Sequence, residues 1–169
     1  NIDRYINKAE KVLDIKYNEE QKEAISKSLI NNISVITGGP GTGKTTIIKG
    51  IIKTYSLIYK VSENSIKDHV LLLAPTGRAA KRMTEMTGIE ASTLHRLLEI
   101  GKINDDGLYK KSQDYQGTPI DADIVIVDEM SMVDMFLMNY LLQSVYLGTK
   151  LILVGDSDQL PSVGAGNVL

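Results

Sequence analysis

The segment ISVITGGPGTGKT, which spans Ile33–Thr45, decides the fold. It begins with a short apolar run, typical of a buried strand, and continues into glycines that match the pattern G-x-x-x-x-G-K-[ST]. Glycines let a backbone wrap around phosphates, and the helix that follows adds the partial positive charge of its N-terminus. Lys44 can reach the β- and γ-phosphates of a nucleotide, and the Thr45 hydroxyl can ligate Mg²⁺. The alternative is a glycine-rich turn with an accidental Lys-Thr pair, and the position between strand and helix argues against it.

Three further apolar runs predict strands of the same kind. Each is short and almost continuously apolar, which is typical of parallel strands buried on both faces. The four predicted strands are Ile33–Thr37, Val70–Ala74, Ile124–Asp128 and Leu151–Val154. Apolar residues at helical spacing predict helices within Ile47–Ile58, Ala79–Met86 and Met135–Leu142, the second ended by Gly88 and the third capped by Asp134. This alternation predicts an α/β fold, a parallel sheet sandwiched by helices.

One segment interrupts the alternation. Gly101–Pro119 is polar and rich in glycine and aspartate, and its Asp106-Gly107 dipeptide is a turn signal between short flanks. It predicts a small β-hairpin inserted into the fold.

Composition excludes several classes of protein. There is no Cys and there are only two His, so disulfides, thiolate metal sites and cysteine nucleophiles are excluded. No apolar run approaches the roughly 18–20 residues of a membrane span. The formal net charge of −2 leaves nucleic-acid binding to a local basic strip.

An acidic pair follows the third strand. A strand that ends in Asp-Glu places a carboxylate at the carboxyl edge of the sheet, where ligands of open α/β folds bind. Asp128 is expected to hold Mg²⁺, usually through water, and Glu129 to orient or deprotonate an attacking water. The alternative is a solvated acidic pair, and the phosphate loop earlier in the chain favours the catalytic interpretation. A water-activating base also favours an ATPase over a kinase.

The segment Gly155–Pro161 follows the fourth strand. The amide of Gln159 could hydrogen-bond a γ-phosphate or the attacking water at this edge, or it could only cap a turn. The residues alone do not decide between the two.

Five segments together closely resemble the RecD-type DNA helicases of superfamily 1. These segments are ITGGPGTGKTT, LLLAPTGRAAKRM, ASTLHRLL, IVIVDEMSMVD and LILVGDSDQLPSVGAGNVL. The family includes the alpha subunit of exodeoxyribonuclease V and a stand-alone RecD-like branch, which the segment IKYNEEQKEAI resembles more. The resemblance covers Tyr17–Leu169 in order and spacing.

The resemblance implies a P-loop NTPase of RecA-like fold. The family has two such domains with ATP and Mg²⁺ between them, and residues 1–169 would be the first, with a helical lead-in at 1–16 and a pin-like hairpin at 101–119. It implies that Lys44, Glu129 and Gln159 are catalytic and that Thr45 and Asp128 hold the metal. The nucleotide would be bound by Gln21, Gly38, Gly39, Gly41, Thr42, Gly43, Lys44, Thr45 and Thr46.

Gln21 has two interpretations. The resemblance implies that it reads the adenine edge, which suits a bidentate amide. Asn18 followed by Gln21 is also a helix capping box.

The resemblance also implies contacts with single-stranded DNA or duplex ends. The matching residues are Thr76, Gly77, Arg78, Thr93 and His95, and the local basic strip would comprise Arg78, Lys81, Arg82 and Arg96. A solvated helix face remains the alternative for Lys81 and Arg82, and a structural hydrogen bond for His95.

For the whole protein the resemblance implies a cytoplasmic, DNA-stimulated helicase of recombination and repair that moves 5′→3′, with other exodeoxyribonuclease V subunits as candidate partners. The chain starts at Asn1 and stops within a glycine-rich pattern, so we expect a piece of a longer protein. Without the second domain's arginine finger, this piece should bind nucleotide weakly and hydrolyse it barely. The rival classes are a P-loop phosphotransferase and a non-catalytic nucleotide- or DNA-binding module. An intact Lys44, Asp128 and Glu129 argue against a degenerate site.

The resemblance also implies a strand order. In the sheet, the phosphate-loop strand Ile33–Thr37 would lie beside Leu151–Val154, which precedes Gly155-Asp156. The strand Ile124–Asp128 would come next, and Val70–Ala74, which leads into Pro75-Thr76, would come last. Ile33–Ile36 would then form an apolar edge. An unpaired edge invites pairing with another chain, so we expect self-association, or cover from Asn1–Lys16.

Overall fold

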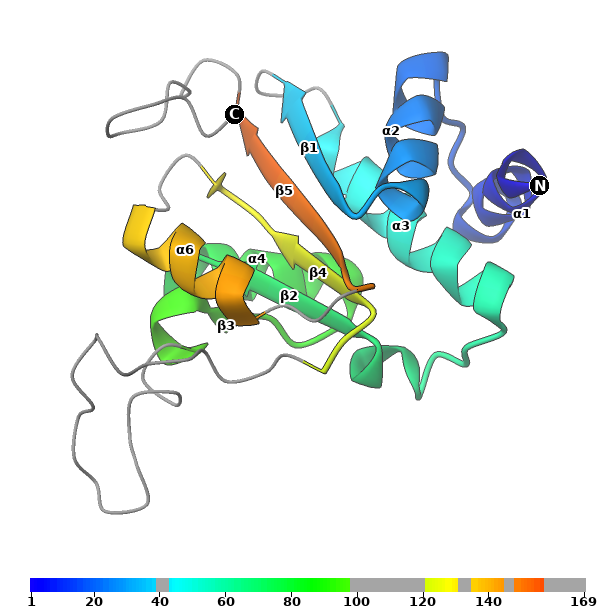
Figure 1. Cartoon of the computed structure of the whole chain (residues 1–169). Helices are drawn as coiled ribbons and strands as arrows, with labels where there is room; N and C mark the ends of the chain where they lie inside the picture. The colour runs from blue at the N-terminus through cyan, green and yellow to red at the C-terminus, as the bar shows by residue number, and fades with distance from the viewer. Residues whose placement is uncertain (39–42, 98–120, 131–134, 145–147, 157–169) are drawn as a thin grey trace.

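A computed structural model describes residues 1–38, 43–97, 121–130, 135–144 and 148–156 (Figure 1). In chain order its elements are α1 (Ile2–Leu13), α2 (Glu19–Ile30), β1 (Ile33–Gly38), α3 (Lys44–Tyr59), the 3₁₀ helix η1 (Ile66–Asp68), β2 (Val70–Ala74), α4 (Gly77–Thr87), β3 (Ser92–Thr93), β4 (Ile124–Val127), α6 (Met135–Ser144) and β5 (Lys150–Asp156). The predicted strands and helices are confirmed, and Gly88 ends α4 in the left-handed conformation with φ 75°. The hairpin expected at Gly101–Pro119 and the cap expected at Asp134 lie outside the described residues.

The described strands form one parallel sheet of five strands in the order β1-β5-β4-β2-β3. The expected order of the four predicted strands is confirmed. The two-residue strand β3, which pairs with the end of β2, was not expected, because Ser92 and Thr93 form no apolar run. All carboxyl ends of these parallel strands therefore meet at one edge.

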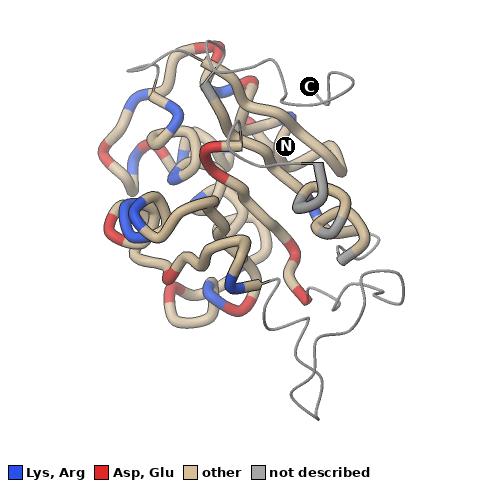
Figure 2. The backbone as a smooth tube through the Cα atoms, turned by 90° about the vertical axis from the view of Figure 1, so that its left-hand side faces the viewer, with Lys and Arg blue, Asp and Glu red and all other residues tan. Residues whose placement is uncertain are grey.

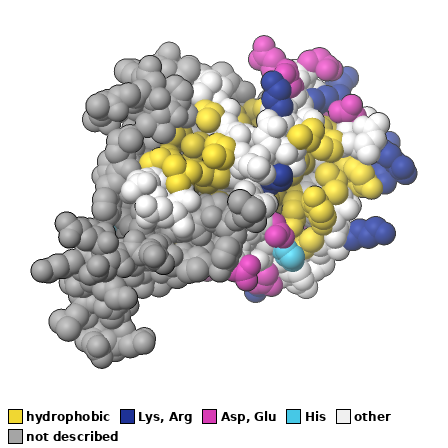
Figure 3. Space-filling model, in the orientation of Figure 1, with side chains coloured by type: hydrophobic (Ala, Val, Ile, Leu, Met, Phe, Trp, Pro, Cys, Tyr) yellow, Lys and Arg dark blue, Asp and Glu magenta, His cyan; other side chains and the backbone are white. Residues whose placement is uncertain are grey.

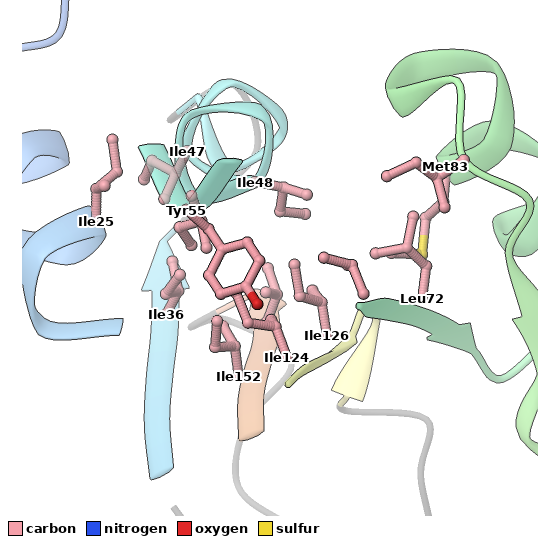
Figure 4. Close-up of a cluster of buried hydrophobic side chains, with 14 of the residues drawn as sticks. Ile25, Ile36, Ile47, Ile48, Tyr55, Leu72, Met83, Ile124, Ile126 and Ile152 are labelled. Carbon is pink, nitrogen blue, oxygen red and sulfur yellow. The ribbon is translucent and has the colours of Figure 1, made fainter. Parts of the chain in front are cut away.

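Side chains alternate between two buried layers, one on each face of the sheet. The first layer packs beneath α2, α3 and α4 and includes Ile36, Leu72, Ile126 and Ile152 (Figure 4). The second layer lies on the α6 face and includes Leu73, Val125 and Leu153 together with Met138 and Leu141 of α6. Strands buried on both faces explain why the sequence shows continuous apolar runs rather than alternation.

A close helix contact fixes α3, which begins at the phosphate loop. A Cβ added at Gly50 would lie 2.6 Å from Ile25 Cδ1 and 2.7 Å from the Tyr17 hydroxyl. The Tyr17 hydroxyl also donates to the Thr46 carbonyl oxygen at 3.1 Å. Burial, aided by the negative charge of Glu10, raises the pKa of Tyr17 to about 12, so the phenol remains a donor at neutral pH.

Strand β1 is the outer strand of the described sheet, paired only with β5 there. Its side chains Ile33 and Val35 are 56% and 44% exposed, and apolar side chains reach the molecular surface in Figure 3. Asn1–Lys16 adds no strand beside β1, because α1 packs on α3 and α2 instead. The expected apolar edge is confirmed, and the alternative that Asn1–Lys16 covers it is wrong.

A polar cluster lies at the amino-terminal ends of the strands, opposite the carboxyl edge of the sheet. The Tyr55 hydroxyl donates to Asp123 Oδ2, and His69 Nδ1 lies 2.7 Å from the same oxygen. The hydrogen bonds from Tyr55 and then His69 lower the pKa of Asp123, whereas burial raises the pKa of Tyr55. The cluster joins α3 to the starts of β2 and β4, away from the carboxyl edge.

No helix in the described ranges is long and apolar enough to cross a membrane.

Candidate functional site

The phosphate loop connects β1 to α3. Strand β1 ends at Gly38 and α3 begins at Lys44, with Gly43 as its N-cap at φ 78°. This left-handed conformation is open to glycine at little cost, so Gly43 fits the position. Gly39, Gly41 and Thr42, which the sequence also assigned to this loop, lie outside the described residues.

The start of α3 suits an anionic ligand. Gly43 provides no side-chain cap, and the first turn carries no acidic residue, so its backbone N–H groups and positive dipole end face the loop. Lys44 Nζ donates to the Gly38 carbonyl oxygen at 3.0 Å, which places the ammonium beside the carboxyl end of β1. Thr45 is exposed in the same turn. These residues fit the phosphates of a nucleotide.

Gln21 lies against this loop. Its Oε1 accepts from the Asn18 backbone N–H at 3.0 Å, and Asn18 Oδ1 accepts from the Gln21 N–H at 2.8 Å, so the capping box is confirmed. A Cβ added at Gly43 would lie 2.5 Å from Gln21 Nε2. The amide therefore caps α2 and approaches the phosphate loop at once, and its adenine contact stays a prediction.

The acidic pair directly follows β4. The Asp128 N–H donates to the Leu73 carbonyl oxygen at 2.9 Å, and Asp128 Oδ1 accepts from the Glu129 N–H at 2.8 Å. Glu129 has φ 52°, a left-handed conformation that costs a non-glycine residue about 1–3 kcal/mol and that clusters at functional sites. Its Oε1 accepts from Arg82 Nη2 at 2.9 Å, a contact that the sequence did not predict.

The sheet brings these groups to one edge. In the register of β1 and β5, Gly38 lies beside Asp156, and β4 is the next strand after β5. The phosphate loop and the acidic pair are thus separated by the width of β5 alone. Gln159, the expected γ-phosphate sensor, lies outside the described residues.

A family model described as an AAA domain matches residues 21–165. The chain belongs to this AAA domain family. It is 39% identical over 166 residues to the RecBCD enzyme subunit RecD of Buchnera aphidicola from Acyrthosiphon pisum. The aligned region covers 88% of this chain and 26% of that protein. It is 41% identical over 148 residues to the ATP-dependent RecD2 DNA helicase of Deinococcus radiodurans, covering 88% of this chain and 19% of that protein. The resemblance to RecD-type helicases is confirmed.

Solved structures agree with this placement. The Bacteroides Pif1 helicase bound to single-stranded DNA matches with a TM-score of 0.54 and 26% identity, over 89% of this chain and 34% of that one. This supports the expected P-loop, RecA-like fold. The chain spans about a quarter or less of the length of the two curated relatives.

The candidate DNA contacts of this AAA domain cluster at the far end of the same edge. Thr76 is the N-cap of α4, where its Oγ1 accepts from the Ala79 N–H at 3.2 Å, and Gly77 and Arg78 are exposed beside it. Strand β3 places Thr93 beside Ala74. The hydroxyl of Thr76 is thus engaged as a cap acceptor, while its own hydrogen can still be donated.

Thr93 also serves as a cap. Its Oγ1 accepts from the Arg96 N–H at 3.1 Å, and His95 is exposed between them. Figure 2 shows lysines and arginines interspersed with acidic residues along the described backbone. A basic strip of Arg78, Lys81, Arg82 and Arg96 stays a prediction.

The described part of the AAA domain also contains a cavity of about 760 Å³ away from this edge. It lies between the end of α1, the middle of α3 and the end of α4, with Ile52, Lys53 and Met86 among its lining residues. Since α4 begins at the carboxyl edge and this cavity adjoins its other end, the cavity is not the nucleotide site.

Proposed function

We propose that this chain is the first RecA-like, ATP-binding domain of an ATP-dependent DNA helicase of the RecD type. The observation that carries the proposal is the shared edge, where the start of α3 and the Asp128-Glu129 pair lie one strand apart. The similarity to RecD and RecD2 supports the choice of helicase over phosphotransferase. The chain spans 26% and 19% of the length of these relatives. We therefore propose the second domain and the helicase activity for the full-length protein that contains this chain.

Each residue at this edge would have a specific role in ATP hydrolysis. The N–H groups of residues 43–46 and the Lys44 ammonium would bind the β- and γ-phosphates, and Gln21 Nε2 would donate to the adenine edge. Thr45 and Asp128 would hold Mg²⁺, which supplies charge neutralisation on the phosphates when bound. Glu129 would accept the proton as water attacks the γ-phosphorus and ADP leaves. Gln159 would contact the γ-phosphate.

Single-stranded DNA is the proposed track. The solved Pif1 structure supports this, because that protein is bound to single-stranded DNA and shares the fold. Thr76, Gly77, Arg78, Thr93 and His95 would touch the phosphate backbone at the α4 and β3 end of the edge. The relatives named RecD suggest the other subunits of a RecBCD-type enzyme as partners, and the relative named RecD2 suggests action alone.

The test uses the full-length protein that contains this domain. We expect Lys44→Ala to abolish ATP binding, and Glu129→Gln to retain ATP binding while lowering DNA-stimulated turnover by about 10²–10⁴-fold, the usual contribution of a general base. Binding is measured with a fluorescent ATP analogue and turnover by phosphate release. Lys11→Ala on the exposed face of α1 and Glu90→Gln in an exposed loop are the matched controls.

Two results would contradict the proposal. One is normal turnover by Glu129→Gln. The other is strong DNA-dependent turnover by the 169-residue chain alone, since the arginine finger is assigned to the second domain.

A further inference from the structure

Arg82 and Glu129 form an ion pair across the site. Arg82 Nη2 donates to Glu129 Oε1 at 2.9 Å, and the two side chains are 66% and 32% exposed. Arg82 comes from the outer face of α4, whereas Glu129 follows β4. The pair therefore joins the element nearest the candidate DNA contacts to the proposed general base.

The pair opposes the work of a general base. To accept a proton, a carboxylate oxygen must point a lone pair at the attacking water. A guanidinium occupies such a lone pair with a charge-assisted hydrogen bond. The Glu129 backbone is fixed separately, because its N–H donates to Asp128 Oδ1. Only the Glu129 side chain has to turn when Arg82 leaves.

The face of α4 that carries Arg82 is basic, so it suits a phosphate as a second partner for Arg82. Arg78 lies one turn before Arg82, so the two guanidiniums share a face of the helix with Lys81 beside them. Arg78 and Lys81 are both exposed, and α4 begins at the candidate DNA contact Thr76. A DNA phosphate bound on this face would compete with Glu129, because guanidinium binds phosphate bidentately.

We propose that Arg82 is a positioning residue that restrains Glu129 in the DNA-free protein and releases it when a DNA phosphate binds to α4. The inference rests on the proposed function. It gives DNA stimulation of ATP hydrolysis a specific contact. Water reaches the pair, because Arg82 is 66% and Glu129 32% exposed, and ion pairs of this kind shift equilibria by about two- to five-fold. The restraint therefore accounts for that share of the stimulation.

The experiment measures ATP turnover by the full-length protein at saturating Mg²⁺ and ATP. Without DNA, Arg82→Ala should raise turnover about two- to five-fold, and with a saturating oligonucleotide its turnover should equal that of the wild type. Arg82→Lys keeps the charge and should lie between the two. Arg4→Ala, the same change on exposed α1, should leave both rates unchanged.

Salt provides a readout that a structural role would not give. Raising the ionic strength screens the exposed pair, so the DNA-free rate of the wild type should approach that of Arg82→Ala, whose own rate should not rise. A DNA-free rate that Arg82→Ala leaves unchanged or lowers overturns the proposal, whether or not thermal stability falls. If the wild type shows no DNA-stimulated turnover at all, the proposed function fails instead.

Discussion

Gly43→Ala tests how the phosphate loop is supported. Gly43 has φ 78°, and a Cβ there would lie 2.5 Å from Gln21 Nε2 and 3.8 Å from Gln21 Cδ. The left-handed backbone costs an L-residue about 1–2 kcal/mol, offset by about 0.4–1 kcal/mol from the stiffer unfolded chain. The net backbone cost is therefore about 0–1.6 kcal/mol.

The close contact adds a second cost. The obstructing atom is the end of a flexible side chain, so Gln21 can move aside. Moving it breaks the hydrogen bond from the Asn18 N–H to Gln21 Oε1, which is worth about 0.5–1.5 kcal/mol. We expect Gly43→Ala to lower the free energy of unfolding by about 0.5–3 kcal/mol in total.

A double-mutant cycle separates the two costs. In a Gln21→Ala background the amide is gone, so Gly43→Ala should cost only the backbone part, about 0.5–1.5 kcal/mol less than in the wild type. Urea unfolding of the 169-residue chain, followed by circular dichroism, measures all four proteins. Equal costs in both backgrounds would refute the idea that Gln21 and Gly43 support each other.

Two further predictions concern other parts of the domain. The hydrogen bonds from Tyr55 and His69 lower the pKa of Asp123 in the folded state, so its ionised form stabilises the fold above about pH 4, and this stabilisation is lost as acid protonates it. Because the side chain is 56% exposed, Asp123→Asn should cost less than about 1 kcal/mol at pH 6, and this cost should shrink steadily as the pH falls below about 4, measured by urea unfolding at each pH. Val35→Lys on the β1 edge should abolish the expected self-association of the 169-residue chain in light scattering, while Lys16→Ala should not; a chain that is already monomeric contradicts the expectation.

The sequence predicted most of the fold because its signals are local. Continuous apolar runs mark strands buried on both faces, and they located β1, β2, β4 and β5. The glycine pattern located the phosphate loop, and the Asn18-x-x-Gln21 spacing located the capping box. Strand β3 was not predicted, because its two polar residues, Ser92 and Thr93, form no periodic apolar pattern.

The sequence did not predict contacts between distant segments, for a different reason. Gly50 looked like an ordinary helix residue, and only the approach of Tyr17 and Ile25 shows why no larger side chain fits there. Arg82 looked like part of a solvated helix face, yet it pairs with Glu129, 47 residues later. Neither residue belongs to a local pattern that would reveal its partner.

Helix α4 shows how the site can respond to a ligand without a change of fold. Ala79, Ala80 and Met83 on its inner face are buried, so the helix cannot shift without opening the core. Its outer face carries Arg82, whose long side chain is largely exposed. A phosphate at α4 can therefore act on Glu129 through the reorientation of one side chain. The rigid inner face keeps Thr76 in place while this happens, because Thr76 follows β2, which belongs to the same sheet as the strand β1 that leads into the phosphate loop.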